Sequence, residues 1–208
     1  MTCSRWGKKA AAFASFFLAA CLLGGPASAD RGDDGRRFVE TLADRAIQSL
    51  TTGDVSRDER IHRFRQMFDE SFAADAIGKW VLGRNWQQAT PDEQTEYLKL
   101  FKDYIVASYV DRFAAYTGEK LQITKVLAKD GEPITVFSEI LRPDTGKTPV
   151  RVDWRMEGSG QQIKIVDLVV EGVSMSTTLR SDFGSIIRRD GGLPGLLKVL
   201  REKTATLR

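Results

Sequence analysis

The sequence predicts an α+β fold in which helices cover one face of a curved antiparallel sheet of about four strands. Two changes of pattern along the chain carry this prediction. Up to Gly118, apolar residues recur every three or four positions, as they do along one face of a helix. After Gly118 they recur at every second position, as they do in a strand with one buried face. Because helices precede strands, we expect a layer of helices on a sheet.

The first two helices are separated by a glycine and a capping motif. An apolar stripe runs from Phe38 to Leu50, and Gly53 is expected to end that helix. Ser56 and Glu59 have the spacing of a capping box, so a second helix is expected to begin there. The sequence therefore predicts two amphipathic helices in succession.

A short helix over residues 73–82 precedes the clearest helix start in the chain. Residues 90–93 supply a capping threonine, a proline suited to the first helical position and a glutamate that can reach back to the cap. From there one helix is predicted to run to Thr117, with Gly118 as its stop. At 1.5 Å per residue it would be about 40 Å long. Tyrosines and phenylalanines along one side make it the expected cover of the sheet.

Four segments after the long helix have the pattern of strands. The first begins at Leu121, and the second covers residues 134–141. In the third, residues 150–156, apolar and charged side chains alternate, which indicates one buried face. The fourth, residues 163–173, is apolar on both faces and is therefore expected at the centre of the sheet.

The first thirty residues have the pattern of a secretory signal. Three basic residues precede the apolar run 10–23, which is shorter than the roughly 20 residues that span a bilayer. The small-x-small pattern of residues 27–29 predicts cleavage behind it. We therefore expect residues 1–29 to be a signal peptide and residues 30–208 to form one domain. The alternative is a lipobox, which would make the protein a lipoprotein attached through Cys21.

Removal of the signal leaves a chain of balanced charge without cysteine. Three of the 31 basic residues lie in the signal, so 28 basic and 28 acidic residues remain. This balance argues against a nucleic-acid partner held by its phosphates. Cys3 and Cys21 both precede the cleavage point. The remaining domain therefore has no disulfide, no thiol nucleophile and no thiolate metal site.

The sequence contains no recognisable catalytic or metal-binding motif. His62 is the single histidine and is expected on the solvated side of the second helix. The glycine-rich residues 191–195 lack the lysine and the preceding strand of a phosphate loop, so they are expected to connect two final helices. The first of these is predicted over residues 177–189, and the second ends near Arg208.

One carboxylate interrupts an apolar strand. Asp167 lies within the fourth predicted strand, where a charge must be paired to avoid a large desolvation cost. We expect an ion pair with an arginine of the neighbouring strand. The alternative is an enzyme that acts on an apolar substrate through a cavity carboxylate with a raised pKa, for which Asp103, Asp111 and Asp167 are the candidates.

Three segments of the chain resemble the MlaC family, also called toluene-tolerance proteins of the Ttg2 type. They are residues 68–86, with Trp-Val-Leu-Gly-Arg-Asn-Trp at their end, residues 90–116, and residues 165–183 with Ile-Val-Asp-Leu-Val-Val-Glu-Gly-Val-Ser-Met. Their order and spacing match the family over about residues 36–206. Two departures are residues 161–164, in place of a tryptophan-lysine pair, and Leu179, in place of a tyrosine.

The resemblance implies a periplasmic carrier with an NTF2-like cone and an internal apolar cavity for phospholipid tails. It implies no catalytic residue, no metal and no cofactor. The implied partners are phospholipid, an inner-membrane ABC transporter complex with an MCE-domain protein, and an outer-membrane lipoprotein complex. The alternatives are a carrier of another lipid such as a hopanoid, an enzyme of the same fold, and a protein-binding module with a filled core.

Periodicity alone does not distinguish a filled core from a cavity lined by the same residues, and the resemblance favours the cavity. The expected walls of this lipid slot are Val81, Leu82, Trp86, Phe101, Tyr104, Ile105, Tyr109, Val136, Val152, Trp154, Val169, Val173 and Met175.

Overall fold

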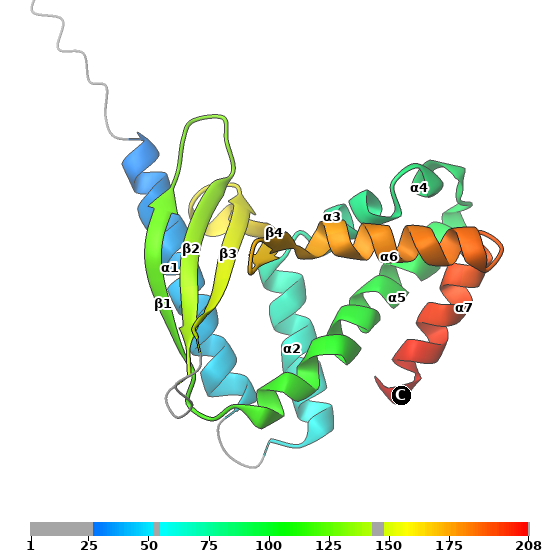
Figure 1. The fold of residues 1–208 in the computed structure, drawn as a ribbon, viewed down its shortest axis with the longest axis horizontal. Coiled ribbons are helices and arrows are strands. Elements are labelled where there is room, and N and C mark those ends of the chain that lie inside the picture. Colours follow the sequence, from blue (N-terminus) through cyan, green and yellow to red (C-terminus); the bar gives the residue numbers. More distant parts are fainter. Residues whose placement is uncertain (1–26, 52–54, 143–147, 208) are drawn as a thin grey trace, which may run out of the picture.

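The computed structural model describes residues 27–51, 55–142 and 148–207, which form helices packed on an antiparallel sheet (Figure 1). The strands are β1 (Lys120–Leu127), β2 (Ile134–Leu141), β3 (Val150–Glu157), β4 (Lys164–Val170) and β5 (Val173–Ser174). They pair in the order β1-β2-β3-β4-β5. The α+β class is confirmed, and the predicted fourth strand is divided into β4 and the two-residue β5. Residues 1–26 of the expected signal, and Gly53, lie outside the described residues.

Helices come before and after the sheet in the sequence. The α-helices are α1 (Ala27–Leu50), α2 (Arg57–Ser71), α3 (Ala74–Leu82), α4 (Arg84–Gln88), α5 (Pro91–Tyr109), α6 (Met175–Arg189) and α7 (Leu193–Thr204). Three 3₁₀ helices are η1 (Val110–Ala115), η2 (Gly160–Gln162) and η3 (Ala205–Leu207). None of the helices in the described ranges is both long enough and apolar enough to span a bilayer.

Both capping signals predicted from the sequence are present. The hydroxyl of Ser56 accepts a hydrogen bond from the Glu59 amide at 3.2 Å and begins α2. At α5, the hydroxyl of Thr90 accepts from the Glu93 amide at 3.3 Å, and the Glu93 carboxylate accepts from the Thr90 amide at 2.9 Å. Both caps satisfy backbone donors that have no partner within the helix, and the cap of α5 is reciprocal. These two helix starts are therefore confirmed.

The predicted long helix changes its winding before it ends. The α-helical part stops at Tyr109, and the next six residues form the 3₁₀ helix η1. Side chains three apart lie on one side of a 3₁₀ helix. This winding directs buried Val110 and half-buried Phe113 to the same side, where both pack in the sheet core. The Phe113 ring lies 5.4 Å from that of Phe64. The prediction of one α-helix to Thr117 is therefore wrong over its last turns.

The strand β4 is not central, contrary to the prediction. It pairs with β3 along most of its length but with β5 at only two positions. Near its start it meets the segment between α2 and α3 instead, where the Ala73 amide donates to the Ile165 carbonyl at 2.9 Å. Both faces of β4 are apolar because both are covered: Leu168 packs against the core on one side, and Val169 is 6% exposed on the other.

Buried side chains form two hydrophobic cores. The sheet core lies between the sheet, α1, α2 and η1 and comprises Val39, Leu42, Leu50, Ile61, Phe64, Met67, Val106, Val110, Ile134, Val136, Met156, Ile163 and Ile165. The helical core lies among α3, α5, α6 and α7 and comprises Val81, Leu82, Tyr97, Leu100, Phe101, Phe183, Leu196, Leu197 and Leu200. Figure 1 shows α5 running between the region beside α2 and the region of α6 and α7.

A glycine allows α1 to lie close to the sheet. A Cβ atom added at Gly35 would lie 2.6 Å from Cγ2 of Ile134 and 3.3 Å from Cε of Met156. Real Cβ atoms do not approach another atom to 2.6 Å, so a larger residue here would require a shift of the Ile134 side chain or of the helix. The first half of α1 thus packs closely on β1 and β2, and the cavity described below is lined by residues of its second half.

Candidate functional site: an apolar cavity between sheet and helices

A cavity of about 390 Å³ lies between the inner face of the sheet and the helices α1, α2, α5 and η1. Its apolar lining consists of Leu42, Ala43, Ala46, Ile47, Phe64, Met67, Phe68, Phe72, Ile77, Phe101, Ile105, Tyr109, Phe113, Tyr116, Leu121, Ile140, Trp154, Val166, Leu168, Met175 and Leu179. This volume falls in the range of ligand pockets, about 300–1,000 Å³. An apolar space of that size is suited to a hydrocarbon ligand.

Small residues on α1 contribute to the open space. Ala43 and Ala46 face the cavity from the second half of the helix, whereas bulky Phe64 and Met67 face it from α2. A methyl side chain fills far less volume than the leucine or phenylalanine that would close a helix-sheet interface. The apolar stripe of α1 therefore packs tightly near Gly35 and leaves a gap about two to three turns further on.

The strand β3 supplies the largest side chain on the sheet side of the cavity. The Trp154 ring lines the space, and its indole nitrogen donates a hydrogen bond to the buried hydroxyl of Ser138 on β2. A buried indole N–H needs a partner, and this one is satisfied within the sheet rather than by water. The ring is thus fixed in orientation without adding a polar atom to the cavity.

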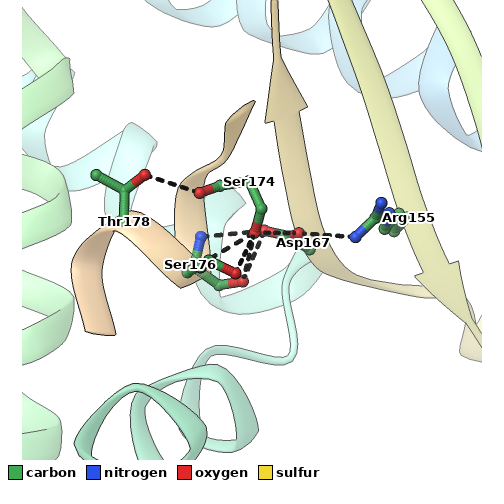
Figure 2. Close-up of polar contacts among 6 residues, drawn as sticks. Arg155, Asp167, Ser174, Ser176 and Thr178 are labelled. Atoms are coloured by element: carbon green, nitrogen blue, oxygen red, sulfur yellow. Dashed lines mark hydrogen bonds and ion pairs between the residues drawn. The ribbon is translucent and has the colours of Figure 1, made fainter. Parts of the chain in front are cut away.

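At one end of the cavity, Asp167 joins β4 to the start of α6 (Figure 2). Its Oδ1 accepts from the amide and the hydroxyl of Ser176 at 3.1 and 2.8 Å. Its Oδ2 accepts from the Ser174 hydroxyl at 2.7 Å and from Arg155 at 3.4 Å. These four donors match the roughly four acceptor sites of a carboxylate. The predicted ion pair with an arginine of the neighbouring strand is confirmed.

The other candidate acid–base groups lie away from this cavity. Asp103 pairs with Arg65 at 2.7 Å, and Asp111 pairs with Arg57 at 3.1 Å. His62 is exposed, as predicted. Asp167 is thus the one candidate carboxylate at the cavity wall, where its two oxygens are engaged by the donors of Figure 2. This arrangement is that of a structural carboxylate that caps a helix.

The opposite end of the cavity carries charge. Arg112 from η1 and Lys120 from the start of β1 line it together with Glu119 and Tyr116. The Arg112 guanidinium lies over the ring of Tyr109, 5.4 Å from its centroid. The cavity therefore has an apolar interior and a polar end formed by a short stretch of consecutive chain.

The expected wall residues separate into two groups. Those that line the cavity are Phe101, Ile105, Tyr109, Trp154 and Met175. Those that lie elsewhere are Val81, Leu82, Trp86, Tyr104, Val136, Val152, Val169 and Val173. Most of the second group are buried in the two cores or beside them, whereas Val173 is 54% exposed. Whether each residue in the cavity contacts a ligand stays a prediction.

Sequence reasoning missed the contribution of the first two helices. Residues of α1 and α2, among them Ala46, Phe64 and Met67, form a large part of the wall but were not among the expected wall residues. The available signal was the pair of alanines at positions 43 and 46 within an otherwise bulky stripe. Small side chains at core-facing positions indicate either close helix approach or a gap.

A helix-covered sheet with an apolar cavity between sheet and helices is suited to a protein that binds an apolar ligand. The chain belongs to the MlaC protein family, whose model matches residues 40–202. The resemblance inferred from the three sequence segments is thereby confirmed.

The chain is also similar to two individual proteins. It is 22% identical over 119 residues to the toluene tolerance protein ttg2D of Pseudomonas putida, a match that spans 57% of this chain and 54% of that protein. The chain thus spans about half the length of this relative. The phospholipid-binding protein from Ralstonia solanacearum, solved in complex with a phospholipid, has the same fold, with a TM-score of 0.72 and 23% identity. That likeness covers 82% of this chain and 97% of the other.

Proposed function

We propose that the mature protein is a periplasmic phospholipid carrier and not an enzyme. It would shuttle lipid between an outer-membrane lipoprotein complex and an inner-membrane ABC transporter complex with an MCE-domain protein, and so help to maintain outer-membrane lipid asymmetry. The observation that carries this proposal is the apolar cavity of about 390 Å³. Family membership and the phospholipid bound to the Ralstonia protein of the same fold support it.

The physical need for such a carrier follows from the hydrophobic effect. A diacyl phospholipid contains about 30 methylenes, and each exposed methylene costs about 0.8 kcal/mol, so exposure of both tails in water would cost over about 20 kcal/mol. Free lipid therefore does not cross an aqueous compartment quickly. A dry slot that covers the tails removes most of this barrier and leaves the headgroup in water.

Loading and release require the slot to open. The cavity is bounded on one side by the sheet and on the other by helices from separate parts of the chain, so a movement of helices against the sheet would expose it. We propose that the membrane complexes favour this open state, whereas the arrangement described here covers the tails during transit.

A carrier of another lipid, such as a hopanoid, is the second candidate. One observation favours it: Leu179 lines the cavity at the position where the family resemblance leads us to expect a tyrosine. This substitution makes the wall more apolar. Lipid identification distinguishes the two candidates in the same experiment.

The test is mass spectrometry of protein purified from an exporting host without detergent. We expect native spectra to show non-covalent adducts, and organic extracts to contain phospholipid in near-stoichiometric amount. A bare chain mass after gentle purification would contradict the carrier function. Extracts that contain hopanoid but no phospholipid would support the second candidate instead.

The proposed periplasmic location has its own test. Replacement of Ala29 by tyrosine should block maturation, because signal peptidase needs a small residue there. Cys21→Ser should leave a fully processed protein that is released by osmotic shock. Labelling of the wild type with palmitate, or loss of processing in Cys21→Ser, would show a lipoprotein instead.

A further inference from the structure

The charged residues at the cavity wall differ in whether they have a partner of opposite charge. They are Asp167 at one end and Arg112, Glu119 and Lys120 at the other. Asp167 is matched by Arg155 and two serine side chains. Arg112 and Lys120 form no ion pair with any carboxylate in the described ranges 27–51, 55–142 and 148–207. One end of an apolar cavity therefore carries two cations that are not engaged in an ion pair within these ranges, although the Glu119 carboxylate lies at the same end.

The neighbouring carboxylate does not neutralise these cations directly. Glu119 instead accepts hydrogen bonds from the amide of Thr117 at 2.8 Å and from its hydroxyl at 3.1 Å. The bond from the Thr117 amide is the main cause that holds the pKa of Glu119 below its ordinary value, and the nearby charge of Arg142 adds to it. Glu119 thus serves to fold the turn between η1 and β1.

The arginine is held in a defined position. Its guanidinium lies over the face of Tyr109, whose ring is itself part of the cavity wall. Tyr116, which lines the same cavity, donates a hydrogen bond from its hydroxyl to the Glu119 carbonyl at 3.0 Å. A guanidinium stacked on an aromatic ring keeps its N–H donors free at the edge, which suits it to bind a phosphate.

We propose that Arg112 and Lys120 bind the phosphodiester of a glycerophospholipid whose tails fill the cavity. This inference rests on the proposed carrier function and adds to it the recognition of the lipid phosphate. A phosphate that both side chains reach would accept charge-assisted hydrogen bonds from the guanidinium and the ammonium group. Because every glycerophospholipid has this phosphate, the site would select phospholipids over uncharged lipids with the same tails and discriminate little between headgroup alcohols.

The test is a competition between two lipids that differ only in the headgroup. Delipidated full-length mature protein is loaded from a detergent-solubilised equimolar mixture of dioleoylphosphatidylethanolamine and dioleoylglycerol, and the bound ratio is read by mass spectrometry. In Arg112→Gln/Lys120→Gln we expect this ratio to fall by about tenfold, the size expected when charge-assisted hydrogen bonds are lost. Binding of dioleoylglycerol itself should not change. Replacement of the ethanolamine by glycerol should leave the wild-type ratio nearly unchanged.

The matched control is Arg188→Gln/Lys203→Gln, which removes the same charge from exposed positions on α6 and α7 that do not line the cavity. Its ratio should equal that of the wild type. An equal fall in both variants, or no fall in either, would overturn the proposal.

A titration with inorganic phosphate separates a lipid headgroup from a free anion. Saturable binding of inorganic phosphate that Arg112→Gln abolishes, together with an unchanged lipid ratio in the double variant, would mean a site for free phosphate and overturn the headgroup proposal. If the wild type loads neither lipid, the carrier function itself fails, a result distinct from loading without headgroup preference.

Discussion

The indole nitrogen of Trp154 donates a hydrogen bond to the hydroxyl of Ser138 at 2.9 Å, and that hydroxyl donates in turn to the Val152 carbonyl at 2.8 Å. This chain of two bonds joins β2 and β3 directly beneath the cavity. Ser138 is 1% exposed, so water does not replace it. The orientation of the largest cavity side chain on the sheet therefore depends on one buried hydroxyl.

Ser138→Ala should destabilise the protein by about 1–3 kcal/mol, because it leaves the indole N–H buried without an acceptor. Trp154→Phe in the Ser138→Ala background should then cost less than Trp154→Phe alone, since both partners are gone. Free energies of unfolding from urea titrations of the four proteins give the coupling. Additive effects would show that the hydrogen bond contributes nothing.

Ala46→Phe should lower bound lipid while the domain stays folded. The added ring enters the cavity from α1, where it occupies open space rather than a packed core. The control is Val169→Phe, because Val169 is buried outside the cavity, where overpacking costs about 1–3 kcal/mol. Lipid-to-protein ratio and thermal midpoint are measured after delipidation and reloading. A filled core is indicated if Ala46→Phe is as destabilised as the control and keeps its lipid.

Asp167→Ala should cost about 2–4 kcal/mol, because it removes the acceptor for the first turn of α6 and leaves several donors unpaired. Arg155→Gln should cost under about 1 kcal/mol, since the arginine is 50% exposed and its pair is screened by water. Chemical unfolding of both variants checks the order. Equal losses would mean that the ion pair, and not the cap, dominates.

Acid should weaken the contact between α5 and α7. Two hydrogen bonds from Arg201, at 2.6 and 2.8 Å, are the main cause that lowers the pKa of Glu96 below its ordinary 4.5. A lowered folded-state pKa gives stability that is present above 4.5 and is lost as the pH falls below it. Glu96→Gln should therefore lose less stability than the wild type between about pH 5 and about pH 3.

The matched control for this pH dependence is Glu202→Gln, which removes a carboxylate from α7 that has no ion pair in the described part of the chain. Its pH profile should follow that of the wild type. Unfolding midpoints in urea at several pH values are the measurement. Parallel profiles for Glu96→Gln and the wild type would show that the pair of Glu96 and Arg201 contributes nothing to the pH dependence of stability.

Local signals explain what could be predicted from the sequence. A cap such as Thr90 with Glu93, and the alternation over residues 134–141, depend on neighbours within one turn or one strand, and both elements begin where expected. Asp167 was predictable because a charge in an apolar strand needs a partner within reach, and the adjacent strand supplies Arg155.

The walls of the cavity were less predictable because they depend on contacts between distant segments. Periodicity identifies Tyr104 as a residue of the apolar side of α5, but its partner is Phe183, whose ring lies 5.6 Å away and comes from α6. Likewise Val136 is fully buried, yet it packs in the sheet core rather than at the cavity. An apolar helix face lines a cavity or a filled core according to where the helix crosses its neighbours. The positions of these crossings cannot be predicted from a local sequence pattern.

The continuity of α5 determines how the molecule loses its structure. Phe101 belongs to the helical core and Val106 to the sheet core, although only about one helical turn separates them along the same rod. When either core melts, the other loses a wall and cannot persist as a separate unit. We therefore expect the two cores to unfold as one cooperative system, and partial unfolding to be confined to segments that α5 does not support.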